Sequence, residues 1–446
     1  MLTKKYAGFL LLLLSGLCHS SSAQTLNKAK LDSLFTALAT HDKAMGSLTL
    51  SQNGNVVYSR AIGYESIGAT TKTPATTATR YRIGSVSKMF TATMVFQLID
   101  EGKLALTTPL ATYFPELPNA KTITVGNLLN QRSGLHNFTS DAAYLTYLTQ
   151  PQTQAEMVKL IGQSKPDFEP NAKFAYSNSN YVLLGYIIEK TTKQTFNQAL
   201  QQRIATKAKL KDTYYGGKID PKRHESFSYR FVATWQPSTE TDMSIPGGAG
   251  AVVSTPTDLA RFVEALFTGK LVSEKSLNQM KTITDGYGYG LIQFPIGNKR
   301  AYGHNGGIDE FSTMLAYFPD EKLAVAYSSN GQAYPLNDIM IGVLNTYFGA
   351  PYRIPDFKAS AIKLSAAELA QYAGTYTSTK IPLKITVSAT GNTLQAQPTG
   401  QMPFPLTPVG KDAFTFDGAG VRMEFAPARH EMLLKQGGGS FLFTLE

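Results

Sequence analysis

The chain has 446 residues, which is too long for one ordinary domain and predicts two or three. With 43% hydrophobic and 17% charged residues, its composition is that of a globular protein and excludes a disordered or membrane-embedded chain. Its net charge of +10 comes from scattered lysines and arginines, so we expect a generally basic surface and no nucleic-acid partner.

The first 23 residues have the features of a secretory signal peptide, with a basic start, an apolar run at residues 7–17 and small residues at 21–23. The apolar run is too short to span a membrane, so we expect cleavage near Gln24, a periplasmic or secreted product and no integral membrane segment in the mature chain. Cys18, the only cysteine, lies within this peptide, and whether it carries a lipid stays open. Cleavage therefore leaves no disulfide and no cysteine nucleophile.

The mature chain begins with a predicted helix and a predicted hairpin. Apolar residues recur at i, i+3, i+4 and i+7 over residues 31–38, which indicates an amphipathic helix. Asn53-Gly54 separates two alternating apolar runs within residues 46–64, a strong hairpin signal. After a threonine-rich loop, the apolar run at residues 89–98 predicts a helix that opens at Ser85 and stops at Gly102.

Helical periodicity dominates from residue 124 to about residue 211, and a further helix is predicted over residues 257–267, with Thr257 and Asp258 as candidate caps. Residues 287–330 return to strands, two of which pair across a four-residue turn. Strands thus precede and follow the helical middle. The pattern predicts an α/β (α+β) domain over residues 24–355, in which an antiparallel sheet made from both ends of the domain is flanked by helices and carries a helical subdomain.

The tail at residues 356–446 differs in composition from the rest of the chain. After a predicted helical turn at residues 364–371, short alternating strands are separated by Gly, Pro and Asn turns. This pattern is typical of a small separate β domain, either a lipocalin-like barrel or a sandwich. Its role and the oligomeric state of the chain stay open.

The start of the helix near residue 85 carries a candidate nucleophile. Ser85 and Lys88 form Ser-x-x-Lys, and on a helix they lie one turn apart on the same face. A serine hydroxyl is a poor nucleophile until a nearby base removes its proton. A lysine in an apolar pocket can be that base, because desolvation lowers its pKa. A four-residue motif is weak alone, so the prediction depends on other clusters.

Two further clusters lie at junctions between loops and regular elements. Tyr176-Ser177-Asn178 precedes a predicted helix, and His304-Asn305-Gly306-Gly307 precedes the predicted strand hairpin. A tyrosine near positive charge can act as a general base or proton shuttle. The asparagine amide can orient a substrate carbonyl and bond the lysine, and the two glycines allow a backbone to approach a substrate closely.

Together these residues resemble the penicillin-recognising serine hydrolases, which comprise class C β-lactamases, serine D-Ala-D-Ala carboxypeptidases and related esterases. Their motifs Ser-x-x-Lys, Tyr-x-Asn and Lys/His-x-Gly occur here in that order, and flanking segments such as Ser133-Gly134-Leu135 are also similar. The resemblance covers about residues 30 to 350. It implies a β-lactamase/transpeptidase-like fold and cleavage of a D-Ala-D-Ala-type peptide, expected to be peptidoglycan-derived, or of a β-lactam. A carboxylesterase and an inactive binding or regulatory homologue are the alternatives.

The resemblance also implies roles for individual residues. Ser85 would attack the carbonyl and form an acyl-enzyme, while Lys88 and Tyr176 would share the proton, and the choice of base between them stays open. The amides of Ser85 and Gly307 would form the oxyanion hole. The implied substrate-binding residues are Asn178, His304, Asn305, Gly306 and Gly307.

The third motif departs from the β-lactamase pattern, because His304 replaces a lysine. A permanent cation there would attract a substrate carboxylate, whereas histidine is mostly neutral near pH 7. An esterase, a D-peptidase or an amidase therefore fits better than an efficient β-lactamase, and a structural histidine that donates to a backbone carbonyl is a further alternative. The other histidines of the mature chain show no ligand spacing, so we expect no metal or cofactor. The segment Tyr287-Gly288-Tyr289-Gly290 could line the pocket, although we favour packing at a strand edge.

Overall fold

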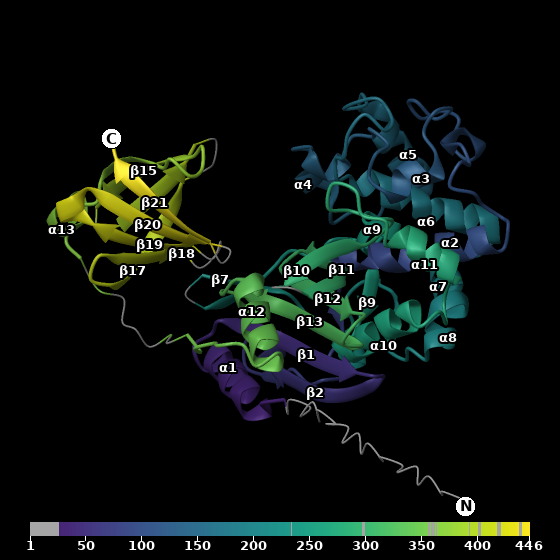
Figure 1. Ribbon diagram of the computed structural model, residues 1–446. Coiled ribbons are helices and arrows are strands. Elements are labelled where there is room, and N and C mark those ends of the chain that lie inside the picture. Colours follow the sequence, from purple (N-terminus) through teal and green to yellow (C-terminus); the bar gives the residue numbers. More distant parts are fainter. Residues whose placement is uncertain are drawn as a thin grey trace, which may run out of the picture.

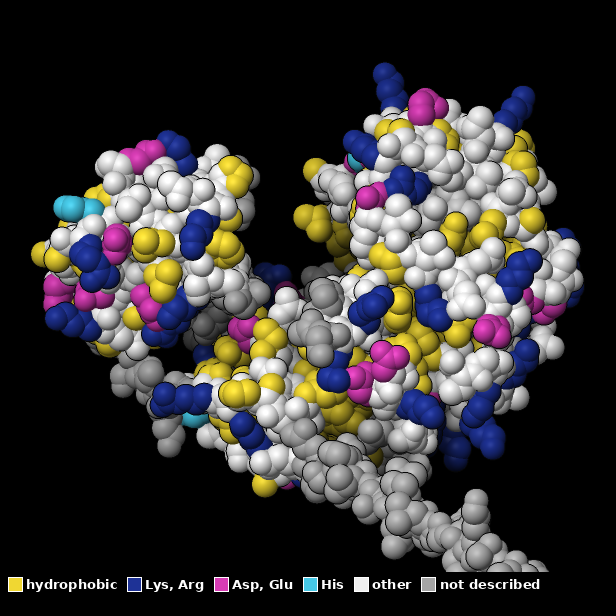
Figure 2. All heavy atoms as spheres, in the orientation of Figure 1, with side chains coloured by type: hydrophobic (Ala, Val, Ile, Leu, Met, Phe, Trp, Pro, Cys, Tyr) yellow, Lys and Arg dark blue, Asp and Glu magenta, His cyan; other side chains and the backbone are white. Residues whose placement is uncertain are grey.

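The computed structural model describes residues 26–446 except 233, 297–298, 356, 358–361, 363, 392, 400–402, 417–420 and 437–438. The predicted signal peptide and Cys18 lie outside the described residues. No helix within the described ranges is both long enough and apolar enough to span a membrane. Lysines and arginines are scattered over the face shown in Figure 2, interspersed with carboxylates and apolar side chains, as the sequence predicts.

The described residues form a central antiparallel sheet with the strand order β10-β11-β12-β13-β1-β2 (Figure 1). Two short strands, β7 and β8, extend it beside β13. Strand β13 pairs with β1 along its whole length, from Ala44↔Gln332 to Gln52↔Leu323, so the prediction of a sheet made from both ends of the domain is confirmed. The strands are β1 (Ala44–Gln52), β2 (Asn55–Ile62), β7 (Tyr229–Phe231), β8 (Trp235–Pro237), β10 (Ile292–Ile296), β11 (Lys299–Ile308), β12 (Phe311–Phe318) and β13 (Leu323–Gln332).

Helices α1 (Lys28–Thr40) and α12 (Leu336–Tyr347) cover one face of this sheet (Figure 1). The apolar stripe predicted over residues 31–38 is fully buried there, because Leu31, Leu34, Phe35 and Leu38 all face the sheet. The hairpin between β1 and β2 is also confirmed. Asn53 and Gly54 both have positive φ, 53° and 80°, the combination that a two-residue hairpin turn requires.

The other face packs against the helical subdomain and helices α2 (Ser87–Asp100) and α10 (Pro256–Phe267). The alternation of β12 shows the two faces, because Met314 and Ala316 contact the first layer and Leu315 and Tyr317 the second. The remaining helices of this layer are α3 (Val125–Leu129), α4 (Tyr144–Tyr147), α5 (Gln154–Gln163), α6 (Asn178–Thr192), α7 (Phe196–Leu200), α8 (Thr206–Ala208), α9 (Gly247–Gly250) and α11 (Glu274–Met280).

Two predicted helix starts were wrong in detail. Ser85 lies in a short 3-10 helix, η1 (Gly84–Val86), and α2 begins only at Ser87. Gly84 has a φ of 51°, which an α-helix cannot contain. The N-cap of α10 is Thr255, whose side chain accepts a hydrogen bond from the Asp258 amide, because Pro256 takes the first helical position. The predicted stop of α2 is confirmed, since Gly102 has a φ of 70°.

Short strands hold the segment that leads into η1. Strand β9 (Val252–Ser254) pairs with both β5 (Tyr81–Arg82) and β6 (Tyr214–Tyr215), and β3 (Tyr64–Ile67) pairs with β4 (Lys72–Pro74). The Arg82 side chain is buried and donates to the carbonyl oxygens of Thr241 and Gly217, and it forms ion pairs with Asp309 and Glu240. These bonds connect η1 to the loop that follows β11.

The tail forms a closed barrel of eight antiparallel strands, which resolves the choice between a barrel and a sandwich (Figure 1). Its interior is apolar and aromatic, with Tyr372, Tyr376, Phe414 and Phe443 buried. The predicted helical turn is α13 (Ala366–Ala370). The strands are β14 (Gly374–Thr377), β15 (Lys384–Thr390), β16 (Thr393–Pro398), β17 (Phe404–Gly410), β18 (Ala413–Phe416), β19 (Val421–Ala426), β20 (Glu431–Gln436) and β21 (Gly439–Leu445). The exact domain boundaries stay a prediction.

Candidate active site

The three sequence motifs meet around the Ser85 hydroxyl. Lys88 Nζ lies 2.9 Å from Ser85 Oγ, within hydrogen-bond distance, and Tyr176 OH donates to the same oxygen over 2.8 Å. The serine comes from η1, the lysine from the first turn of α2 and the tyrosine from the residues just before α6. The fold therefore brings two proton-transferring groups to one serine.

Lys88 is fully buried, and burial lowers its pKa well below the ordinary value of a lysine. Its Nζ also donates to Asn178 Oδ1 and to the Ala249 carbonyl oxygen, each over 2.8 Å. Both of these oxygens can only accept hydrogen bonds, so they take two N–H groups. In the neutral amine, the lone pair then occupies the third direction, toward the Ser85 hydroxyl.

Asn178 is held so that its amide oxygen faces Lys88. Its Nδ2 donates to Thr139 Oγ1 over 3.0 Å, and its backbone amide donates to Asn137 Oδ1 over 2.9 Å. The predicted bond between the asparagine and the lysine is therefore present. Thr139 and Asn137 were missed at the sequence level, because they lie about 40 positions away in the chain.

Tyr176 is a protonated phenol in this setting. Burial raises the pKa of its hydroxyl, and Lys88 Nζ lies 4.9 Å from the centre of its ring. The other side of the ring contacts Tyr287, with ring centroids 6.1 Å apart and planes at 81°. Its hydroxyl therefore donates a hydrogen bond to Ser85 and holds a proton that can be passed on.

His304 is buried beside Tyr176, with 1% of its surface exposed. Its Nδ1 lies in hydrogen-bond contact with the carbonyl oxygen of Asn305, and its Nε2 lies 3.2 Å from the Tyr287 hydroxyl. Because a carbonyl can only accept, Nδ1 carries the proton and Tyr287 donates to Nε2. Burial, followed by the charge of Lys88, lowers the pKa of His304 to about 3, so the ring is neutral near pH 7.

Tyr287 combines the two roles considered from the sequence. It pairs with Ile292, the first residue of the edge strand β10, and its side chain is buried against Tyr176 and His304 and hydrogen bonds to the imidazole. The sequence Tyr287-Gly288-Tyr289-Gly290 was the one signal available, and nothing in its spacing distinguishes a site residue from a packing residue. The alternative in which His304 donates to a backbone carbonyl agrees with the geometry.

The glycines of the third motif bring β11 directly against η1. A Cβ added at Gly306 would lie 2.1 Å from the Ile83 carbonyl oxygen and 2.9 Å from the Ser85 nitrogen. A Cβ at Gly84 would lie 2.8 Å from the Gly307 nitrogen. The backbones of Ser85 and Gly307 are thus neighbours, as an oxyanion hole made of their two amides requires.

The family model for β-lactamases matches residues 31–341, which is more than half of the chain. The chain belongs to the β-lactamase family. Its motifs, its fold and its relatives agree that it is a serine hydrolase of the β-lactamase and penicillin-binding protein superfamily.

Curated relatives and solved structures of this family share about a quarter of its residues. A penicillin-binding protein of Bacillus subtilis (strain 168) is 28% identical over 429 residues, which cover 90% of this chain and 94% of that protein. A teichoic acid D-alanine hydrolase of Staphylococcus aureus is 26% identical over 292 residues, 64% of this chain and 70% of that protein. The D-amino acid amidase of Ochrobactrum anthropi SV3 is 26% identical, with a TM-score of 0.63 over 72% of this chain and 99% of its own.

The octameric penicillin-binding protein homologue of Pyrococcus abyssi covers 94% of this chain and all of its own, with a TM-score of 0.66. At 22% identity it shows the fold alone. Since the family model ends at residue 341, a coverage of 94% means that this match also extends into the tail.

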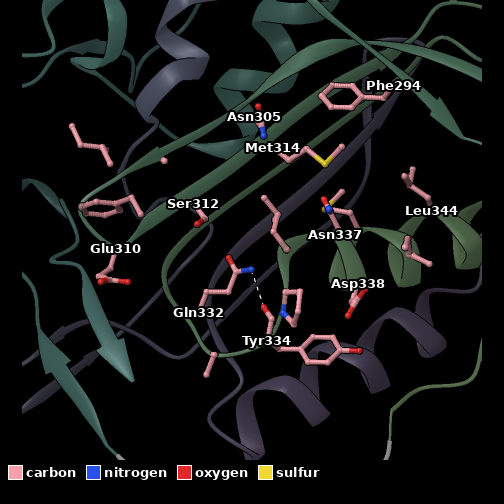
Figure 3. A pocket seen from close by; sticks show the side chains of 18 of the residues that line it. Phe294, Asn305, Glu310, Ser312, Met314, Gln332, Tyr334, Asn337, Asp338 and Leu344 are labelled. Atoms are coloured by element: carbon pink, nitrogen blue, oxygen red, sulfur yellow. Dashed lines mark hydrogen bonds between the residues drawn. The ribbon is translucent and has the colours of Figure 1, made fainter. Parts of the chain in front are cut away.

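One motif residue of this β-lactamase family member does not meet the others. On β11, His304 lies opposite Leu315 and faces the helical layer, whereas Asn305 lies opposite Met314 and faces the α12 side (Figure 3). The Asn305 side chain therefore lines a cleft on the opposite face of the sheet. Among the described residues, no three His, Cys, Asp or Glu side chains are arranged to hold a metal ion.

Proposed function

We propose that the chain hydrolyses an amide or an ester through an acyl-enzyme on Ser85. The observation that carries this proposal is the pair of hydrogen bonds that join Ser85 Oγ to Lys88 and Tyr176, with the pKa of Lys88 lowered by burial. A non-catalytic homologue would have no chemical requirement for a buried lysine amine beside this serine.

Burial favours the neutral form of both partners, and this assigns their starting roles. Neutral Lys88 is the base that takes the Ser85 proton, and protonated Tyr176 is the acid. Ser85 Oγ then attacks the carbonyl carbon, and the amides of Ser85 and Gly307 stabilise the oxyanion. As the tetrahedral intermediate collapses, the bond to the leaving group breaks, and Tyr176 gives that group a proton which the Lys88 ammonium replaces.

Deacylation reverses the same proton path. A water attacks the acyl carbon, its proton passes to Lys88, and the bond between the carbonyl carbon and Ser85 Oγ breaks. The serine oxygen recovers a proton and the free acid leaves. Asn178 keeps the lysine amine aimed at the serine throughout, because its oxygen accepts one of the two N–H groups.

The charge around the site favours a substrate without a carboxylate next to the scissile bond. The third motif, where a lysine would capture such a carboxylate, holds a buried neutral imidazole. We therefore favour a D-aminoacyl amide or ester over a D-Ala-D-Ala peptide or a β-lactam. The names of two relatives, a D-amino acid amidase and a teichoic acid D-alanine hydrolase, support this choice. The predicted signal peptide would place such a substrate in the cell envelope.

The test compares four reagents with purified mature protein: p-nitrophenyl acetate, D-alanine amide, a D-Ala-D-Ala peptide and a fluorescent penicillin. Turnover of the first two, and an acyl adduct seen by intact-protein mass spectrometry, are expected for the wild type and should be absent in Ser85→Ala. Ser33→Ala, on the exposed surface of α1, is the matched control and should keep full activity. Turnover that survives in Ser85→Ala would refute the proposal.

The same comparison separates the alternatives. Penicillin labelling with peptide hydrolysis, and no amide or ester turnover, would favour the carboxypeptidase or β-lactamase branch. Failure of all four reagents would favour a binding or regulatory homologue.

A further inference from the structure

A cleft of about 1120 Å³ lies on the α12 face of the central sheet, opposite the face that carries Lys88 (Figure 3). Its floor is formed by β10, β11 and β12, and one wall is the helix α12. Gln436 of β20 in the barrel also borders it. The cleft is larger than the roughly 300–1000 Å³ typical of pockets for small molecules.

The cleft meets the predicted oxyanion hole at one residue, Gly307. Gly307 lines it, and so does Tyr144 of α4. Asn305 also lines it, two residues back along the same strand and so about 7 Å from Gly307. Among the described residues, β10 pairs with β11 only from Lys299 to Gly303. A group attached to a carbonyl at Ser85 can therefore pass around the edge of β11 at Gly307 and reach the cleft on the other face of the sheet.

The lining chemistry is largely apolar and carries no cation. None of its described lining residues is a lysine or an arginine. Two of its carboxylates are already paired, Asp309 with Arg82 and Glu310 with Arg230. The apolar lining residues include Phe294, Met314, Leu336, Ile341 and Leu344, and the amide side chains are Asn305, Gln332 and Asn337.

We propose that this cleft is a subsite for an uncharged, apolar chain attached to the scissile carbonyl of the substrate, as its acyl group or its leaving group. The inference rests on the proposed function and narrows its substrate class. Each methylene of the substrate that is buried against an apolar wall stabilises the bound complex. Asn305, whose side chain points away from Ser85 into the cleft, gives a polar contact for an amide or ester group of such a chain.

The exposed residues of the α12 wall allow a test that leaves the core intact. Ile341 is 43% exposed and lines the cleft, so Ile341→Trp fills the cleft from the solvent side. Val56 on β2 is 48% exposed and is not among the lining residues, so Val56→Trp is the matched control. Asn337→Trp, also at an exposed position of the cleft, provides a second obstruction if Ile341→Trp fails to fold.

The experiment measures kcat/KM for two series of esters. One varies the acyl chain of p-nitrophenyl esters from acetate to octanoate, and the other varies the alcohol of acetate esters from methyl to octyl. In one of the two series, we expect kcat/KM for the longest ester to exceed kcat/KM for the shortest by more than about tenfold, both for the wild type and for Val56→Trp. This ratio is a small part of what the six added methylenes of the acyl series, or the seven of the alcohol series, can provide. Ile341→Trp should reduce that ratio by about tenfold.

The outcomes distinguish this inference from the proposed function. Loss of acetate turnover in Ser85→Ala tests the nucleophile alone, whereas the chain-length ratio tests the cleft alone. A ratio near one in both series, or a ratio that Ile341→Trp and Asn337→Trp leave unchanged, would overturn the inference while the acyl-enzyme mechanism stands. The cleft would then be a contact region for the barrel through Gln436.

Discussion

Replacing Gly306 by alanine tests the close approach of β11 to η1. A Cβ there would lie 2.1 Å from the Ile83 carbonyl oxygen, so the two segments must separate by at least 0.9 Å to reach the 3.0 Å that real Cβ atoms keep (3.0 − 2.1). Misplacing catalytic groups by about 1 Å costs about 100-fold in rate. If the shift also removes one oxyanion donor, that loss alone lowers kcat by a factor of about 100 to 1000. We expect Gly306→Ala to lower kcat for p-nitrophenyl acetate at least about 100-fold.

Gly307→Ala is the matched comparison, because the nearest atom to its added Cβ is the Phe311 carbonyl oxygen at 3.8 Å. This variant keeps its amide N–H, and we expect its kcat to fall by less than about tenfold, or about 1.4 kcal/mol of activation free energy. Thermal unfolding shows whether each variant is folded, since overpacking costs about 1–3 kcal/mol. Equal kcat values in two folded variants would refute the role given to the spacing between β11 and η1.

Three further changes test the electrostatics of the site and its supports. Burial lowers the pKa of Lys88, so the folded chain binds fewer protons than the unfolded chain, and stability is lost as the pH falls from 10.5 toward the lowered pKa. Lys88→Met should therefore abolish turnover. It should also flatten the rise of the unfolding free energy between about pH 7 and pH 10, which denaturant titrations at each pH measure. Because the pKa of His304 is lowered to about 3, His304→Gln should leave the midpoint of the acid limb of kcat/KM unmoved, and a shifted limb would show that this imidazole titrates there. Arg82→Met leaves Asp309 buried without its ion pair and should lower the unfolding free energy by about 3–5 kcal/mol. Arg429→Ala, in an exposed pair, should change it by less than about 1 kcal/mol, and equal losses would contradict the argument.

Much of the fold follows from local patterns. The helix over residues 31–38, the Asn53-Gly54 turn and the alternating strands of the tail each depend on neighbours within a few positions, so periodicity and turn chemistry predict them. The start of α10 was missed, although Pro256 directly after Thr255 is a start signal that favours threonine 255 as the cap. Gly84, at the start of the 3-10 helix, has a positive φ and lies against Gly307 of β11, a contact that no local pattern reveals.

The site residues also fall into two groups, those that local motifs predict and those that only the tertiary structure brings in. Ser85, Lys88, Tyr176 and His304 belong to motifs with fixed spacing, and the structure brings all four together. Their supports come from distant segments, since the Ala249 carbonyl bonds Lys88 across 161 positions and Tyr287 bonds the imidazole from a glycine-rich loop. The sequence of the third motif also does not show that its second residue, Asn305, points to the other side of the sheet, because that depends on the register with β12.

The barrel closes at the seam between β14 and β21, which has the fewest register pairs of any two neighbouring strands in the described part of the barrel. Among the described residues, β14 and β21 share two register pairs, Tyr376↔Leu445 and Thr377↔Thr444, and one further amide bond joins Glu446 to Thr375. Six register pairs join β20 to β21. Amide protons along this seam should exchange with deuterium before those of the other strands, because a short ladder opens at lower cost. Each opening exposes two unpaired strand edges, so this seam is also where two copies of the chain would exchange their final strands at high concentration.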